Sequence, residues 1–301
     1  ARFEPMRRRA LLSLLALAAA CGPKPLPPLP PAPRVTTPED LLPPDLDVVV
    51  RLDLGRVKSA LGAATVSALA GEVLARGAPK QSADELMIAS LLEADVVHLG
   101  YRPGPSGAPL DRVLALQGHF TQLLQPPDGF SGATDLGADV RYWDATTPPV
   151  REGVARIYAI SDRLRAFVSE AEIDALERQL RGGSERRLEA PAEGTLSLAA
   201  RPALLARLAG HGLLRQLLEG SKRLTAVADL ESDGVRLKAE LVLERPQQAA
   251  DLAAAGKLVL GRLLGDSVGQ VELRADAERV LLSARLSRAE LAPLLQRLGG
   301  G

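Results

Sequence analysis

The chain has 301 residues, of which 46% are hydrophobic and 25% are charged, as in ordinary globular proteins. Its 37 basic and 37 acidic residues balance, which argues against a nucleic-acid-binding protein, because such proteins carry a basic excess. The aromatic content of 3% is low for a carbohydrate-binding platform or an aromatic cage.

Residues 1–20 have the pattern of a secretory signal peptide, with Met6 as the expected start. Arg7–Arg9 form a basic segment, and the apolar run Leu11–Ala20 follows it. The run has the length of a signal-peptide core and is well short of the ~20 residues that a membrane-spanning helix needs.

Cys21 is the only cysteine, and the segment that ends there resembles the lipobox of bacterial lipoprotein precursors. The resemblance implies a lipid on Cys21 after removal of the signal peptide, which also explains an unpaired cysteine in a secreted chain. Ala18 departs from the family, because lipoboxes usually have Leu there. Gly22, in place of Asp, favours the outer membrane. A secretory signal cleaved without lipidation, an uncleaved anchor and a free thiol are the alternatives.

Residues 21–44 are predicted to form a lipidated, proline-rich spacer. Proline fixes φ and removes a hydrogen-bond donor, so Pro23–Pro33 is excluded from helix and sheet interiors. A polyproline II segment, rising about 3.1 Å per residue, would hold the folded part away from the membrane. A ligand for a proline-binding module is the alternative.

Residues 45–183 are predicted to form a first α+β half. An Ala- and Leu-rich helical segment is expected over Val57–Leu74, and a helix over Ser169–Leu180, where Ser169 and Glu172 indicate a capping box. Alternating or apolar runs predict the strands Asp47–Leu54, Asp95–Tyr101, Arg112–Phe120, Asp139–Trp143, Val154–Ile160 and Leu164–Val168.

Residues 184–301 are predicted to form a second half with a more regular order. Ser232-Asp233-Gly234 lies between two alternating runs and is a strong hairpin signal. The expected strands are Gly194–Arg201, Leu224–Glu231, Val235–Leu243, Val271–Ala275 and Val280–Leu286. The expected helices are Pro202–Leu218, Pro246–Leu264 and Ser287–Leu298.

Two helical segments, Ser169–Leu180 and Ser287–Leu298, share a Ser-x-x-Glu start and an apolar stripe, which favours an internal duplication. The predicted fold class is therefore α+β. We expect two related βαββαββα-like halves, with antiparallel sheets and helices packed on one face. Leu42–Leu54 is similar to the openings of uncharacterised bacterial surface proteins, a resemblance that implies a repeated α+β unit and no activity.

The sequence contains no Walker, Gly-x-Gly-x-x-Gly or His-Glu-x-x-His motif. We therefore expect no catalytic residue, no metal site and no cofactor. The carboxylates near Glu170 and Glu172 are expected to lie on a solvated helix start, where they complement the helix dipole.

His98, His119 and Trp143 are the candidates for a ligand surface. The two histidines fall in the strands of one predicted hairpin, but two ligands without a third make a weak metal site. A solvated strand face is the alternative for them. Trp143 is the only tryptophan, and packing beneath a helix is its alternative.

The expected function is that of a membrane-tethered envelope lipoprotein with a non-catalytic binding or assembly role. The expected partners are the membrane, through lipid on Cys21, and an envelope protein, whereas nucleic acid is not expected. The expected location is the bacterial cell envelope, at the outer membrane, facing the periplasm or the exterior. The alternatives are a periplasmic hydrolase-like enzyme with a scattered site and a purely structural envelope protein.

Overall fold

The computed structural model divides the chain into two units, residues 1–31 and residues 32–301. All described residues belong to the second unit, so Cys21 and the proline-rich tract Pro23–Pro33 lie outside them, as does the predicted helix Pro202–Leu218. The described residues are 35, 37–68, 82–102, 111–121, 126–137, 140–147, 153–181, 188–201, 220–264, 271–287 and 289–290.

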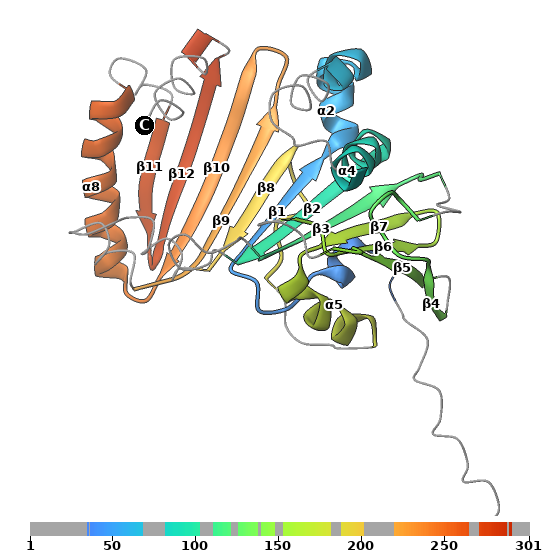
Figure 1. Ribbon diagram of the computed structural model, residues 1–301. Coiled ribbons are helices and arrows are strands. Elements are labelled where there is room, and N and C mark those ends of the chain that lie inside the picture. Colours follow the sequence, from blue (N-terminus) through green and yellow to red (C-terminus); the bar gives the residue numbers. More distant parts are fainter. Residues whose placement is uncertain are drawn as a thin grey trace, which may run out of the picture. The chain divides into compact units, whose positions relative to one another are not determined.

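Twelve strands form one continuous antiparallel sheet (Figure 1). Their order across the sheet is β11-β12-β10-β9-β8-β1-β2-β3-β7-β6-β5-β4. The strands are β1 (Val48–Asp53), β2 (Ala94–Arg102), β3 (Asp111–Gly118), β4 (Thr134–Gly137), β5 (Val140–Asp144), β6 (Arg156–Ile160), β7 (Leu164–Val168), β8 (Leu196–Ala200), β9 (Ser221–Leu230), β10 (Gly234–Leu243), β11 (Val271–Asp276) and β12 (Arg279–Ser287).

The described helices connect these strands and pack against the sheet. They are η1 (Pro38–Leu41), α2 (Leu54–Leu61), α4 (Ser82–Glu93), η2 (Glu170–Glu172), α5 (Ile173–Leu180) and α8 (Pro246–Leu264). The predicted α+β class and the antiparallel pairing are confirmed. The predicted bounds of α8 and β7 are those observed, whereas α4 and β4 have no counterpart among the predicted elements.

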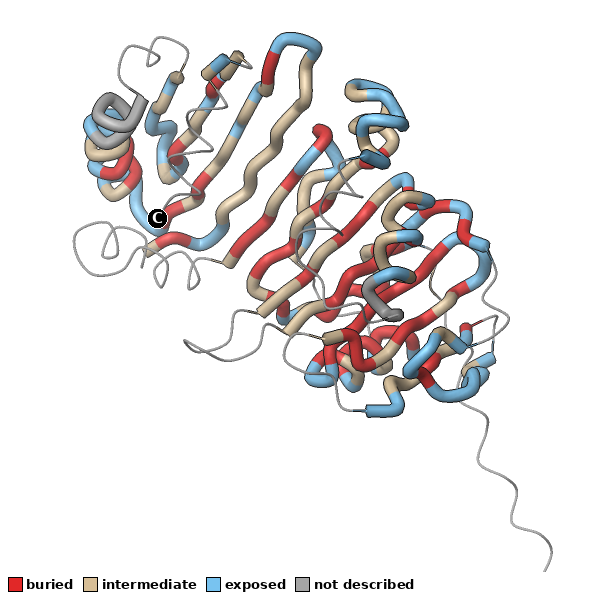
Figure 2. The backbone as a smooth tube through the Cα atoms, turned by 45° about the horizontal axis from the view of Figure 1, so that its top comes forward, coloured by how far each residue is buried: buried red, intermediate tan, exposed pale blue. Residues whose placement is uncertain are grey.

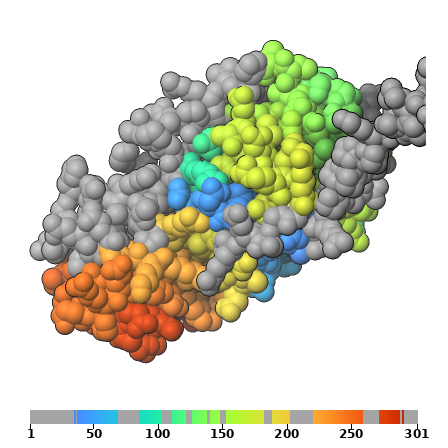
Figure 3. Space-filling model, turned by 90° about the horizontal axis from the view of Figure 1, so that it is seen from below, coloured from blue at the N-terminus to red at the C-terminus, as the bar shows by residue number. Residues whose placement is uncertain are grey.

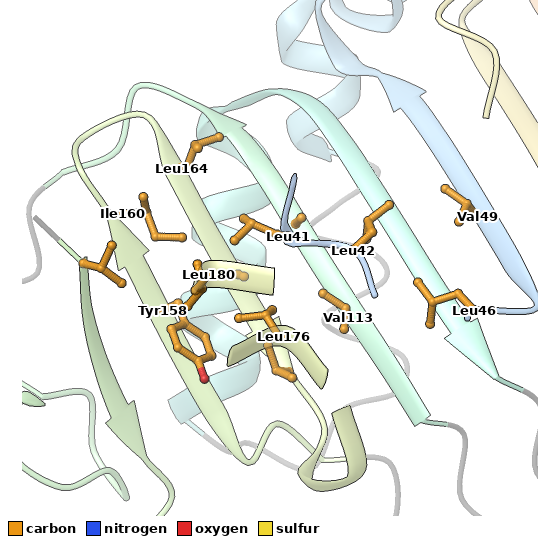
Figure 4. Packing of buried hydrophobic residues seen from close by; sticks show 14 residues of the cluster. Leu41, Leu42, Leu46, Val49, Val113, Tyr158, Ile160, Leu164, Leu176 and Leu180 are labelled. Atoms are coloured by element: carbon orange, nitrogen blue, oxygen red, sulfur yellow. The ribbon is translucent and has the colours of Figure 1, made fainter. Parts of the chain in front are cut away.

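One face of the sheet, called here the η1 face, carries Val49, Val113 and Tyr158. Because side chains alternate along a strand, these residues point away from the other face. They form a core with residues of η1 and α5 (Figure 4). The buried members include Leu41, Leu42, Leu46, Val49, Val113, Tyr158, Ile160, Leu164, Leu176 and Leu180.

The opposite face, called here the α4 face, holds a second core around Trp143 and Phe167, against which Leu86 and Leu91 of α4 pack. Further along the same face, α8 packs against the second half; that core comprises Leu241, Leu243, Ala249, Leu252, Ala253 and Val280. The structure thus differs from the prediction of helices on one face, because η1 and α5 cover the other face of the first half. Figure 2 shows the buried residues concentrated in the first half.

The two halves meet at an antiparallel ladder between β1 and β8, in which Val48 pairs with Ala200 and Leu52 with Leu196. Outward from this ladder, the first half continues as β2, β3, β7, β6, β5 and β4, and the second as β9, β10, β12 and β11. The structure therefore has one sheet where the sequence predicted separate sheets. In Figure 3 the blue segment that contains η1 and β1 lies between the surfaces of the two halves.

The predicted capping box at Ser169 is not formed. The Ser169 hydroxyl accepts a hydrogen bond from the backbone N–H of Arg112 at 2.9 Å, and no side-chain bond caps η2. In the second copy, the Glu290 carboxylate accepts from the backbone N–H of Ser287 at 2.7 Å, as half of a capping box does.

We predict that Leu176→Ala destabilises the protein by about 2–5 kcal/mol, because it opens a cavity at a position with 0% exposure. Leu258→Ala is the matched control, because that side chain is 72% exposed, and its effect should stay within about 0.5 kcal/mol. Urea unfolding followed by circular dichroism measures both. Equal losses of unfolding free energy in the two variants would contradict the packing of Leu176 in the core.

Candidate functional site

A line of side chains crosses the η1 face from the first half into the second. Cross-strand register places each member beside the next on neighbouring strands, so they share one face. This line, called here the polar row, consists of His98, Arg51, Ser197, Val227, Lys238, Ser283 and Glu272.

The polar row is buried on β2, β1 and β8, where it crosses from the first half into the second. Exposure is 1% for His98, 9% for Arg51 and 0% for Ser197. Arg51 lies 3.2 Å from the Asp53 carboxylate, and the Ser197 hydroxyl donates to the carbonyl of Pro191 at 2.5 Å. Arg51 Nη1 and His98 Nδ1 are buried and have no hydrogen-bond partner among the described residues. Buried polar groups are normally hydrogen-bonded, so leaving these two nitrogens without a partner is energetically unfavourable.

Glu39 of η1 reaches the buried end of the polar row. Its Oε1 lies 3.2 Å from His98 Nε2. The hydrogen bond with the His98 ring outweighs desolvation and lowers the pKa of Glu39 from 4.5 to about 2. This pair therefore holds η1 on the sheet through a carboxylate that stays ionised at low pH.

A second polar contact holds the same stretch of chain, residues 37–47, called here the strap. Arg102 of β2 donates to Glu172 Oε1 at 2.5 Å and to Asp45 Oδ1 at 2.5 Å. The hydrogen bond from Arg102 lowers the pKa of Asp45. Glu172 is only 1% exposed, which corrects the expectation of a solvated helix start. Its carboxylate instead joins η2 to β2 and the strap.

The polar row ends in an open groove on the second half. The groove has a volume of about 490 Å³ and lies on β9, β10, β11 and β12, beside Pro191 and Glu193. The charged lining residues are Lys238, Arg274, Glu193, Glu240 and Glu272. Among these, the ion pair that joins described residues is Glu240 with Arg279, at 3.7 Å. The remaining charges are available to a ligand.

The structure does not bring the three predicted ligand residues together. His98 is buried on the η1 face, whereas Trp143, at 1% exposure, lies in the core of the α4 face. His119 is exposed and follows the end of β3, with its Nε2 2.9 Å from Arg163 Nη1. The solvated strand face considered for the histidines therefore does not describe His98.

The groove residues were not among the predicted candidates, although part of their signal was visible. Lys238 and Glu240 occupy the polar positions of an alternating strand, and Glu272 and Arg274 do the same on β11. Alternation places such residues on one face but does not tell whether that face is covered. Arg51 and Glu39 gave no such signal, because their environment depends on a distant strand and on the strap.

The described residues contain no group of three or more His, Cys, Asp or Glu side chains placed to hold a metal ion. Within the same part of the chain, no helix has both the length and the apolar content required for a membrane span.

Comparison with known proteins gives a fold likeness. No protein-family model matches the chain, and no curated protein sequence matches it either. Among solved structures, crystal form III of TP0453 matches with a TM-score of 0.53 and 10% identity, covering 87% of this chain and 99% of that one. Crystal form I of TP0453 gives a TM-score of 0.52 at 11% identity, covering 88% and 98%. The chain therefore shares the fold of TP0453 over 87–88% of its length.

We predict that Glu39→Gln destabilises the protein most above pH 4.5. A carboxylate with a lowered pKa stabilises the folded state fully above its unfolded pKa of 4.5, and this stabilisation is lost as pH falls towards about 2. Urea unfolding at a series of pH values measures the difference between wild type and variant. Glu170→Gln, at an exposed position of η2, is the control and should change stability by less than about 0.5 kcal/mol. A Glu39→Gln effect that is constant from neutral pH to about pH 3 would contradict the hydrogen bond between Glu39 and His98.

Proposed function

We propose that this chain is a lipid-tethered protein of the bacterial cell envelope, with a non-catalytic binding or assembly role. Lipid on Cys21 attaches it to the membrane, and the proline-rich residues 23–33 separate the sheet from the membrane surface. The outer membrane is the proposed site, because Gly22 follows the cysteine. A second envelope protein is the proposed partner.

The observation that carries this proposal is the way in which the strap is fixed to the sheet. Leu41, Leu42 and Leu46 are at most 2% exposed, and their side chains belong to the core of the η1 face. Arg201 donates from its side chain to the carbonyl of Pro44 at 2.7 Å. A strap held by buried leucines, Arg102 and Arg201 keeps the sheet attached to the point where the proposed tether ends.

The solved structures of TP0453 share this fold at 10–11% identity, which is a likeness of fold alone. A binding role is supported by the groove on the η1 face, which presents charges of both signs over a volume of about 490 Å³. Pockets of this size accommodate small ligands or a short segment of a partner.

We predict that Cys21→Ala abolishes metabolic labelling with palmitate and releases the protein from the membrane fraction. The thiol is the attachment point in the proposal, so its removal should eliminate the label. Ala18→Leu is the informative companion, because it restores the usual lipobox residue and should label at least as well as wild type. Label that persists on the Cys21→Ala form would overturn the lipid anchor.

The binding role is tested by capture from the organism's own envelope. Wild type and Cys21→Ala, each bearing an affinity tag, are crosslinked in cells and purified. One envelope protein that is enriched with wild type and reduced with Cys21→Ala supports a tethered binding role. Wild type that captures no protein above a tagged but unrelated lipoprotein argues for the purely structural alternative.

A further inference from the structure

Four charged residues of the groove lie at the corners of a square, and the sign of the charge alternates from each corner to the next. On β10, Lys238 and Glu240 lie two residues apart on the η1 face, and on β11, Glu272 and Arg274 do the same. Cross-strand register aligns Lys238 with Glu272 through Ser283, and Glu240 with Arg274 through Leu281. Each line across the groove therefore has a cation on one side and a carboxylate on the other.

The two charges of a line are separated by one intervening strand. Neighbouring strands lie about 4.8 Å apart, so the charged residues flank a gap of roughly two strand spacings. Ser283, in the middle of the first line, is small and exposed, and its hydroxyl offers both a donor and an acceptor. No ion pair joins Lys238, Glu272 or Arg274 to another described residue, so these charges remain open to an incoming molecule.

The lining of the groove also includes apolar residues, among them Val227, Leu281 and Pro191. A ligand that fits must therefore carry a positive and a negative group at its ends and an apolar body between them. The observed volume of about 490 Å³ lies within the range found for small-molecule sites.

We propose that this groove binds a short zwitterionic peptide. The carboxylate of the peptide contacts Lys238, its ammonium contacts Glu272, and its apolar side chain lies over Leu281. Both termini of a peptide are largely ionised at about pH 7, so the ligand presents the opposite charges that the line requires. The proposal rests on the binding role proposed above, and it names the class of ligand; it does not depend on the lipid anchor.

The test uses the full chain and the tripeptide Ala-Leu-Ala with free termini. Saturation-transfer difference NMR measures binding of the peptide. N-acetylated and C-amidated forms of the same peptide each lack one charge and should bind about two- to five-fold more weakly, as expected for loss of one solvent-exposed ion pair. Equal binding of the free and the doubly blocked peptide, or no binding of the free peptide, would overturn the proposal.

Substitutions in and outside the groove test whether the peptide binds there. The variants Lys238→Gln and Glu272→Gln should each bind the free peptide about two- to five-fold more weakly than wild type. The charge-exchanged double variant Lys238→Glu with Glu272→Lys should recover binding to within about two-fold, because the line again offers both signs. Lys222→Gln and Glu244→Gln remove exposed charges outside the groove and should leave binding unchanged. A loss with these controls equal to that with the groove variants would exclude the groove as the site.

This experiment is separate from the test of the anchor. Peptide binding is measured without a membrane, so it can fail while Cys21 still carries palmitate. Conversely, an unlabelled Cys21 leaves the measured peptide affinity unchanged. A partner captured in cells but no bound peptide would place the interaction on another surface and would reject the peptide proposal alone.

Discussion

The antiparallel ladder between β1 and β8 is the contact on which the rest of the structure depends. It joins strands that are separated by more than a hundred residues and turns two sets of strands into one sheet. Without it, each half would expose a long strand edge with unpaired backbone groups, which is a template for aggregation. The ladder also buries Val48 and Ala200 on one face and Arg51 and Ser197 on the other. Sheet continuity and the polar row thus have the same origin.

The strap is coupled to this ladder at its end. The backbone N–H of Arg201 donates to the carbonyl of Asp47 at 2.8 Å, just before β1 begins, and its side chain donates to Pro44. Glu39 reaches the ladder on the other side through His98, which pairs directly with Arg51. A force applied along the N-terminal segment would therefore act on the central strands rather than on an outer strand.

Local signals predicted the strands and α8 of the second half well and the long-range arrangement poorly. Asp233-Gly234 located the β9–β10 hairpin, and Pro246 located the start of α8, because both depend on neighbouring residues alone. The single sheet could not be inferred, since it depends on pairing between distant β1 and β8. Likewise, Glu172 was expected to lie exposed at a helix start, but a tertiary partner, Arg102, holds it buried.

Local sequence signals were also insufficient to predict the candidate site. His98 and Trp143 were predicted to contribute to a ligand surface, in part because histidine and tryptophan are rare in this chain. In the structure, His98 lies beneath the strap and Trp143 lies in a core. Rarity of a residue type carries no information about its exposure. Glu272 of the groove belongs to a common residue type and Lys238 to a rare one. The significance of both comes from the absence of a described helix over that part of the η1 face. Only the three-dimensional arrangement distinguishes that open stretch from the covered one.

The predicted internal duplication remains a prediction. The order β1-β2-β3-β7-β6 in the first half nevertheless matches the order β8-β9-β10-β12-β11 in the second, which gives the prediction a physical consequence. By strand order, β3 corresponds to β10, and on the η1 face β3 carries Val113 and Ala115 where β10 carries Lys238 and Glu240. Apolar residues at these positions gain free energy when the strap and α5 cover them. Charged residues at the same positions would lose hydration under such a cover without partners to replace it. The side chains on one face of two strands therefore favour the strap over the first half, whereas no described helix covers the same face of the second half.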